Sequence, residues 1–126
     1  MAIEHRNEIS IVGRVSGEAV PTVLPSGDEV TTVRVVVERP RAPAGRGSRQ
    51  RVDTFTCSAW TPQLRRVVRS WYTGDIVEIQ GQLRRRFWRN ENVPQSRYEI
   101  EVNGAQMVAM AAPDPPSGEV SAPTSG

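Results

Sequence analysis

Residues 61–74, with the sequence TPQLRRVVRSWYTG, predict the one helix of a chain that is otherwise rich in strands. Thr61 is a favourable N-cap, and Pro62 stands where proline is tolerated, at the first helical position. Apolar residues then recur at helical spacing, at Leu64, Val67, Val68 and Trp71. Gly74 is expected to end the helix. Because Trp71 completes this apolar stripe, we assign it to the core.

Alternation of apolar and polar residues on both sides of the helix predicts strands. They cover residues 8–15, with a weak continuation at 19–24, and then 30–38, 52–60, 75–88 and 97–108. Turns are expected at 25–28 and 90–94, and Gly13 is expected at a bulge or a close backbone approach. This order predicts an all-β chain, a five-stranded OB-fold barrel with one helix between strands 3 and 4. The alternative, a β-sandwich, leaves the amphipathic helix without a role.

The composition divides the chain into one domain and a tail. Residues 1–110 are expected to form the barrel. Within it, residues 39–51 lack apolar periodicity and predict a mobile basic loop. Residues 111–126 consist of Ala, Pro, Ser, Gly and a few acids, so we expect a disordered tail.

All 16 basic residues are arginine, and the formal net charge is +2. The arginine guanidinium is planar, pairs with phosphates and stacks on bases, so this composition suits a polyanionic partner. Cys57 is the single cysteine, which excludes an internal disulfide and favours a reducing cytosol.

Two tryptophans stand at the polar positions of their alternating strands, on the face that should point away from a barrel core. Trp60 alternates with Thr54, Thr56 and Ser58, whereas Trp88 alternates with arginines. A large aromatic ring on a polar, basic face is suited to stacking on nucleic-acid bases, and such stacking tolerates every base. The alternative is that a bulge reverses the register and buries the ring, or that the ring lies in a subunit interface.

Arginines accompany these rings. Arg84 and Arg86 share a face with Trp88 and are predicted to contact phosphates, whereas Arg85 lies on the opposite face. The alternative is a solvated strand edge. Arg34, on the second strand, is a further candidate. The arginines of the basic loop, predicted to clamp a nucleic-acid backbone unless the loop only aids solubility, are Arg39, Arg41, Arg46, Arg49 and Arg51.

Residues for catalysis are scarce. His5 is the only histidine, and Cys57 has core parity, where a lone cysteine is more often an apolar filler than a nucleophile. With one histidine and one cysteine, the chain cannot assemble a Cys/His metal site. We therefore expect neither an enzyme nor a cofactor.

Several segments resemble bacterial single-stranded DNA-binding proteins (SSB). They are residues 7–15 (NEISIVGRV), 74–88 (GDIVEIQGQLRRRFW) and 98–102 (YEIEV) followed by Met107, in the family's order and spacing. The resemblance covers roughly residues 7–110 and implies an OB barrel, usually a homotetramer around which single-stranded DNA wraps. It also implies that Trp60 and Trp88 are stacking aromatics and that Arg86 contacts the DNA backbone.

The chain departs from well-known members of that family at three places. Pro40 and Thr54 stand where those members carry further tryptophans, so we expect weaker binding or a shorter site. Phe55 could compensate only if the strand register differs from the predicted one. The usual acidic C-terminal tip is missing, so recruitment of replication proteins through it is not expected, and a short accessory paralogue is the better match.

The leading hypothesis is therefore sequence-independent binding and protection of single-stranded DNA by a cytoplasmic, nucleoid-associated protein of replication, repair or recombination. One alternative is a primosome-type OB protein that helps to load replication enzymes. Another, of a different class, is an OB scaffold for protein–protein contacts with Trp60 and Trp88 buried at interfaces.

Overall fold

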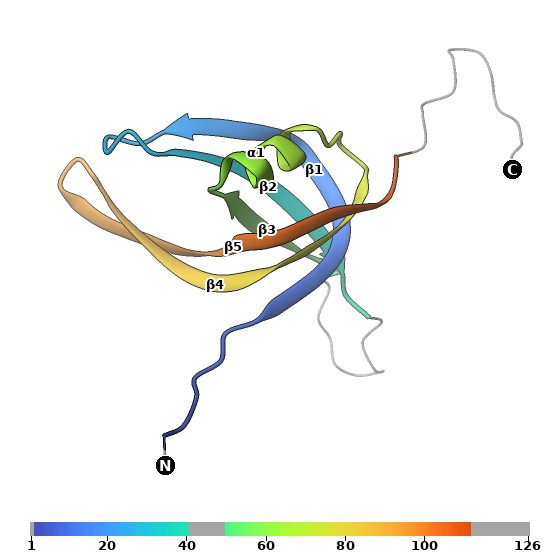
Figure 1. Ribbon diagram of the computed structural model, residues 1–126, viewed down its shortest axis with the longest axis horizontal. Coiled ribbons are helices and arrows are strands. Elements are labelled where there is room, and N and C mark those ends of the chain that lie inside the picture. The colour runs from blue at the N-terminus through green and yellow to red at the C-terminus, as the bar shows by residue number, and fades with distance from the viewer. Residues whose placement is uncertain (1, 41–49, 112–126) are drawn as a thin grey trace, which may run out of the picture.

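Five strands and one helix make up most of residues 2–40 and 50–111, the part of the chain that the computed structural model describes (Figure 1). The elements are β1 (Ile9–Val23), β2 (Glu29–Glu38), β3 (Val52–Ala59), α1 (Pro62–Arg69), β4 (Ile76–Asn90) and β5 (Val93–Ala109). The strands close into a barrel in the order β1-β2-β3-β5-β4. The predicted OB barrel, with its helix between strands 3 and 4, is confirmed. The predicted tail from residue 112 onward and most of the basic loop, including Arg49, lie outside the described residues.

Strand β1 is long enough to pair with both of its neighbours in the barrel, β4 and β2. Residues 9–14 of β1 pair with β4, and the rest of the strand pairs with β2 across an irregularity between Ser16 and Val20. The two segments predicted as a strand and a weak continuation are thus one strand. Gly13 lies at the crossover, where a Cβ atom would collide with the carbonyl oxygen of Val36. The predicted close backbone approach at Gly13 is therefore confirmed.

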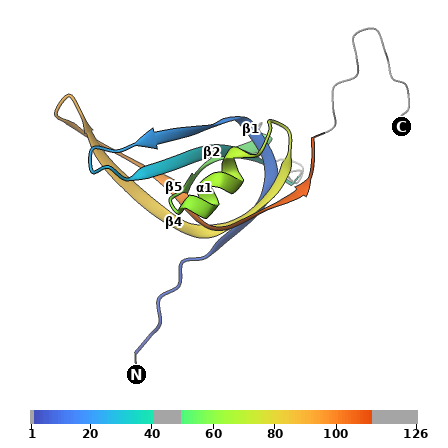
Figure 2. The same cartoon turned by 45° about the horizontal axis from the view of Figure 1, so that its top comes forward.

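The core is built from the predicted inward faces of the strands. Val33 and Val35 of β2, Cys57 of β3 and Ile79 of β4 are almost fully buried. Helix α1 lies across one end of the barrel (Figure 2) and buries Val68 completely. The predicted helix end at Gly74 is wrong, because α1 stops at Arg69. The backbone N–H of the C-cap residue Ser70 bonds the Val67 carbonyl oxygen at 3.1 Å, and the Ser70 hydroxyl bonds the same oxygen at 2.6 Å.

Trp71 is only 6% exposed although it lies beyond the helix. Its assignment to the core is confirmed. Phe55 is partly buried and packs against the same core. It keeps the predicted inward register, so it does not replace the missing aromatic platforms.

Two hairpins extend from the barrel on the same side (Figures 1 and 2). We call the β1–β2 hairpin the first arm and the β4–β5 hairpin the second arm. The second arm is longer than the sequence predicts, since β5 begins at Val93 rather than at residue 97. Glu91 and Asn92 both have positive φ, at 54° and 66°, which permits a two-residue turn that keeps the strands paired to the tip.

The N-cap of α1 gives a stability prediction. The Thr61 hydroxyl oxygen accepts a hydrogen bond from the backbone N–H of Leu64 at 3.1 Å. Thr61→Ala is expected to lower the free energy of unfolding by about 1 kcal/mol, measured by urea denaturation. Thr61→Ser retains the hydroxyl and should lose much less; an equal loss in both variants would contradict the capping role.

Candidate nucleic-acid interface

A groove lies between the two arms, with a cavity of about 450 Å³. The first arm lines it with the small and apolar residues Thr22, Leu24, Val30 and Thr32. The second arm lines it with the larger and charged residues Arg86, Phe87, Trp88, Arg97 and Glu99. One wall is therefore neutral, and the other carries the predicted tryptophan and arginine of β4.

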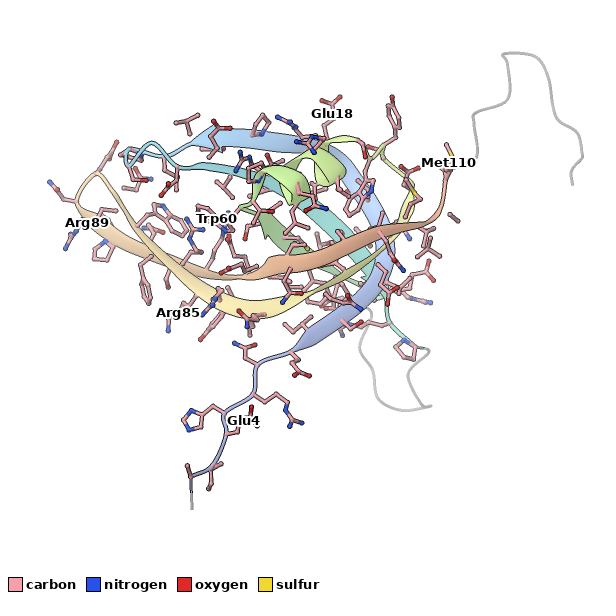
Figure 3. The ribbon with its side chains drawn as sticks, viewed as in Figure 1. Glu4, Glu18, Trp60, Arg85, Arg89 and Met110 are labelled. Atoms are coloured by element: carbon pink, nitrogen blue, oxygen red, sulfur yellow. The ribbon has the colours of Figure 1, made fainter. Side chains whose placement is uncertain are left out.

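Trp60 directly follows β3, and Figure 3 shows it in the space between the arms. Its indole Nε1 donates to the hydroxyl of buried Ser58 at 3.2 Å, which turns the ring back along the strand. The guanidinium carbon of Arg86 lies 4.6 Å from the ring centroid, a cation–π distance. The ring is half-buried, and Arg86 covers one of its two faces. A base can stack on that face only if Arg86 moves.

Trp88 is the more open of the two rings, at 44% exposed. It lines the groove near the outer half of the second arm, where β4 and β5 extend beyond the barrel. The guanidinium carbon of Arg97, on β5, lies 5.7 Å from its ring centroid. Each candidate tryptophan is thus paired with one arginine of the second arm.

Glu99 joins these two pairs, although the sequence did not predict it as a site residue. Its carboxylate is 3.2 Å from Nη1 of Arg86 and 3.3 Å from Nη2 of Arg97, and the residue is only 4% exposed. Arg86 and Arg97 stand directly opposite each other on β4 and β5, where like charges repel. A buried carboxylate in turn needs charged partners. Glu99 therefore holds both arginines in place. The five side chains contact one another in the order Trp60, Arg86, Glu99, Arg97 and Trp88.

Comparisons with known proteins agree with this fold. A family model described as the single-strand binding protein family matches residues 6–110. The chain belongs to this family. Among solved structures, the chain is similar to one described as "Plasmodium falciparum SSB complex with ssDNA", with a TM-score of 0.67 and 21% identity. The match covers 87% of this chain and 99% of that chain, and at this identity it supports the fold alone. A comparison with curated proteins gives no match.

The other predicted arginines of this single-strand binding family member lie at different distances from the groove. Arg34 is exposed on β2 and lines a second cavity of about 240 Å³, which shares Thr32 and Arg97 with the groove. Arg84 lies two residues before Arg86, on the same face of β4, and its Nε donates to the carboxylate of Glu101 at 3.0 Å. A continuous surface therefore runs from Trp88 past Arg97 to Arg34.

Arg51 is not brought to the groove. It is exposed just before β3, whereas Trp60 follows the other end of that strand, roughly 30 Å away along an extended chain. Its neighbour Arg39 is already paired with Asp53, with Nη2 and Oδ1 2.8 Å apart. This hydrogen bond raises the pKa of Arg39 and lowers that of Asp53. Contact of Arg51 with DNA stays a prediction.

Cys57 is fully buried in the core, as its parity predicts. Burial, with a smaller effect from the negative charge of Glu99, raises the pKa of its thiol to about 12. The thiol is therefore neutral at ordinary pH. Among residues 2–40 and 50–111, no three His, Cys, Asp or Glu side chains gather in a cluster able to hold a metal ion. In the same residues, no helix has the length and apolar character needed to cross a membrane.

Proposed function

We propose that this protein binds single-stranded DNA without sequence preference in the groove between the two arms. The main observation behind the proposal is a buried carboxylate, Glu99, that pairs with both Arg86 and Arg97. Each of these arginines lies over a tryptophan ring, Arg86 over Trp60 and Arg97 over Trp88. Membership of the single-strand binding protein family supports it. The solved structure that shares this fold is described as a complex with single-stranded DNA, so the proposal is compatible with the fold.

The mechanism is equilibrium binding, with two contributions to affinity. Trp88 offers an open ring on which a base stacks, and Trp60 offers a second ring when Arg86 moves toward a phosphate. The arginines of this surface neutralise phosphates and release counterions, and they are Arg34, Arg84, Arg86 and Arg97. Arg51 then contacts DNA only where the strand continues to the other end of β3, and Arg49, which lies outside the described residues, stays a candidate for backbone contact.

We further propose that the protein acts as a homotetramer in DNA replication, repair or recombination, in the cytoplasm. The family resemblance supports the assembly state, and binding that ignores base sequence suits all three processes. Measurement of the mass in solution by sedimentation equilibrium tests the assembly state directly.

Titration with oligo(dT), followed by intrinsic tryptophan fluorescence, tests the proposed binding. We expect partial quenching, because bases reach Trp60 and Trp88 whereas Trp71 is buried in the core and keeps its emission. The Kd should rise steeply with salt, by about 0.7 in the log–log slope for each phosphate contact. If oligo(dT) causes no quenching and no salt-dependent binding, the result would contradict DNA binding and favour a protein-binding scaffold.

A further inference from the structure

Arg65 is a residue of α1 whose side chain reaches from the helix to the end of the β2–β3 strand pair. At 17%, it is the least exposed of the arginine side chains that form ion pairs within residues 2–40 and 50–111. Its Nη1 donates to the backbone carbonyl oxygens of Trp60, at 2.5 Å, and Glu29, at 3.3 Å. Its Nη2 lies 3.6 Å from the Glu29 carboxylate. The guanidinium thus joins a candidate stacking residue to the first residue of β2.

This contact lies where the pairing of β2 with β3 stops. The last paired residues are Thr31 and Ala59. Trp60 comes next, but the chain then turns into α1, with Thr61 as the N-cap. A backbone carbonyl group beyond the last strand pair needs another hydrogen-bond donor. Arg65 supplies that donor, so it continues the link between the two strands by one residue.

Other contacts hold the ring of Trp60 rather than its backbone. The indole Nε1 donates to Ser58, and Arg86 lies over the ring. When Arg86 moves toward a phosphate, the ring loses that cover and depends on its backbone and on Ser58 for its place. Among the described residues, the lining of the groove does not include Arg65, and its charge is already paired with Glu29. Arg65 is therefore placed to hold Trp60 rather than to touch DNA.

We propose that Arg65 is a positioning residue, which fixes the backbone of Trp60 so that the ring is in place for a base once Arg86 moves away. This inference rests on the proposed binding of single-stranded DNA in the groove. Without the guanidinium, the Trp60 carbonyl loses its donor, and the connection between β3 and α1 is free to shift. A ring that must be ordered again on binding contributes less to affinity, because the ordering costs conformational entropy.

The first test measures the Kd for oligo(dT) after Arg65→Gln in the wild-type, Trp60→Ala and Trp88→Ala backgrounds. We expect Arg65→Gln to raise the Kd about fivefold in the wild-type and Trp88→Ala backgrounds, the lower end of what one stacked base contributes. In Trp60→Ala, where no ring remains to be positioned, the rise should stay below about twofold. Arg66→Gln is the matched control, since it removes the same charge from an exposed neighbour, and it should match this small rise in every background.

Arg65→Lys keeps the charge and can donate to one of the two carbonyl groups, so it should recover part of the affinity. It also takes the place of Arg65→Gln in the comparison if thermal unfolding shows that the glutamine variant is not folded.

The second test needs no DNA. Quenching of tryptophan fluorescence by acrylamide reports how open the half-buried Trp60 ring is in the free protein. Arg65→Gln should increase this quenching, and the increase should vanish in the Trp60→Ala background.

Wild-type affinity of Arg65→Gln would overturn the inference. So would an equal loss with and without Trp60, which would place Arg65 in contact with DNA, or an equal loss in Arg66→Gln, which would reduce the effect to overall charge. Unchanged acrylamide quenching in Arg65→Gln would overturn it as well. Failure of the wild-type protein to bind oligo(dT) would instead reject the proposed function, and the quenching would then decide by itself whether Arg65 holds Trp60.

Discussion

Replacing Trp88 with alanine is expected to raise the Kd for oligo(dT) by about five- to 150-fold. Stacking of one base on an aromatic ring contributes about 1–3 kcal/mol, and each 1.4 kcal/mol is a factor of ten in the Kd. Trp88 is the ring to test first because it is 44% exposed, whereas Trp60 is half-buried and has Arg86 only 4.6 Å from its ring centroid. Because Trp88 lies on the arm rather than in the core, its loss should leave the fold intact.

The measurement is a titration followed by fluorescence anisotropy of labelled oligo(dT), with thermal unfolding as a check on the fold. Trp88→Phe is the matched variant, since a phenyl ring retains a π-face of smaller area and should restore part of the affinity. Unchanged affinity in Trp88→Ala would remove Trp88 from the site. Equal losses in the alanine and phenylalanine variants would show that stacking is not its contribution.

The fold could be predicted because its local signals agree with one another. Thr61 and Pro62 mark where α1 begins, and the parity of Val33, Val35 and Cys57 separates the core from the surface. The errors arose where the backbone departs from common rules. The turn of the second arm uses positive φ at Glu91 and Asn92, neither of which is glycine, so the sequence suggested a longer turn and a later strand.

The site was predicted in part. Parity was enough to find Trp60, Trp88 and Arg86, because a large aromatic or a charge on the outward face is visible in the sequence alone. It could not show that Arg86 lies over Trp60, since their strands β4 and β3 are separated by β5 in the barrel. Long-range contacts of this kind depend on how the barrel closes.

Glu99 was missed for a related reason. Its parity matches that of Arg97 and Glu101, which predicts a solvated carboxylate, yet the residue is buried against the groove. The available signal was the register of the hairpin: Arg86 stands opposite Arg97, and a carboxylate two residues further along relieves their repulsion. That pairing requires the exact position of the turn, which the sequence placed incorrectly.

Glu99→Gln is expected to strengthen DNA binding at low salt and to steepen its salt dependence. In the free protein, the Glu99 carboxylate occupies both Arg86 and Arg97, so a DNA phosphate must compete with it. Removal of this charge lets Arg86 and Arg97 neutralise phosphates in full, instead of sharing their charge with Glu99, which should steepen the log–log slope of the Kd against salt by about 0.7 to 1.4. Over a tenfold rise in salt, the variant should then lose about five- to 25-fold more affinity than the wild type.

Two further variants separate the charge of Glu99 from its shape and from the overall field of the protein. Glu38→Gln makes the same change of charge at an exposed pair with Arg14, at the far end of β2, and should leave the slope unchanged. Glu99→Asp keeps the negative charge but shortens the reach, so its slope should stay near that of the wild type. A wild-type slope in Glu99→Gln, or an equal change in Glu38→Gln, would show that Glu99 does not compete with the phosphates. If the steeper slope belongs to Glu99→Gln alone, the carboxylate that orders the two arginines in the free protein also limits how strongly they attract DNA.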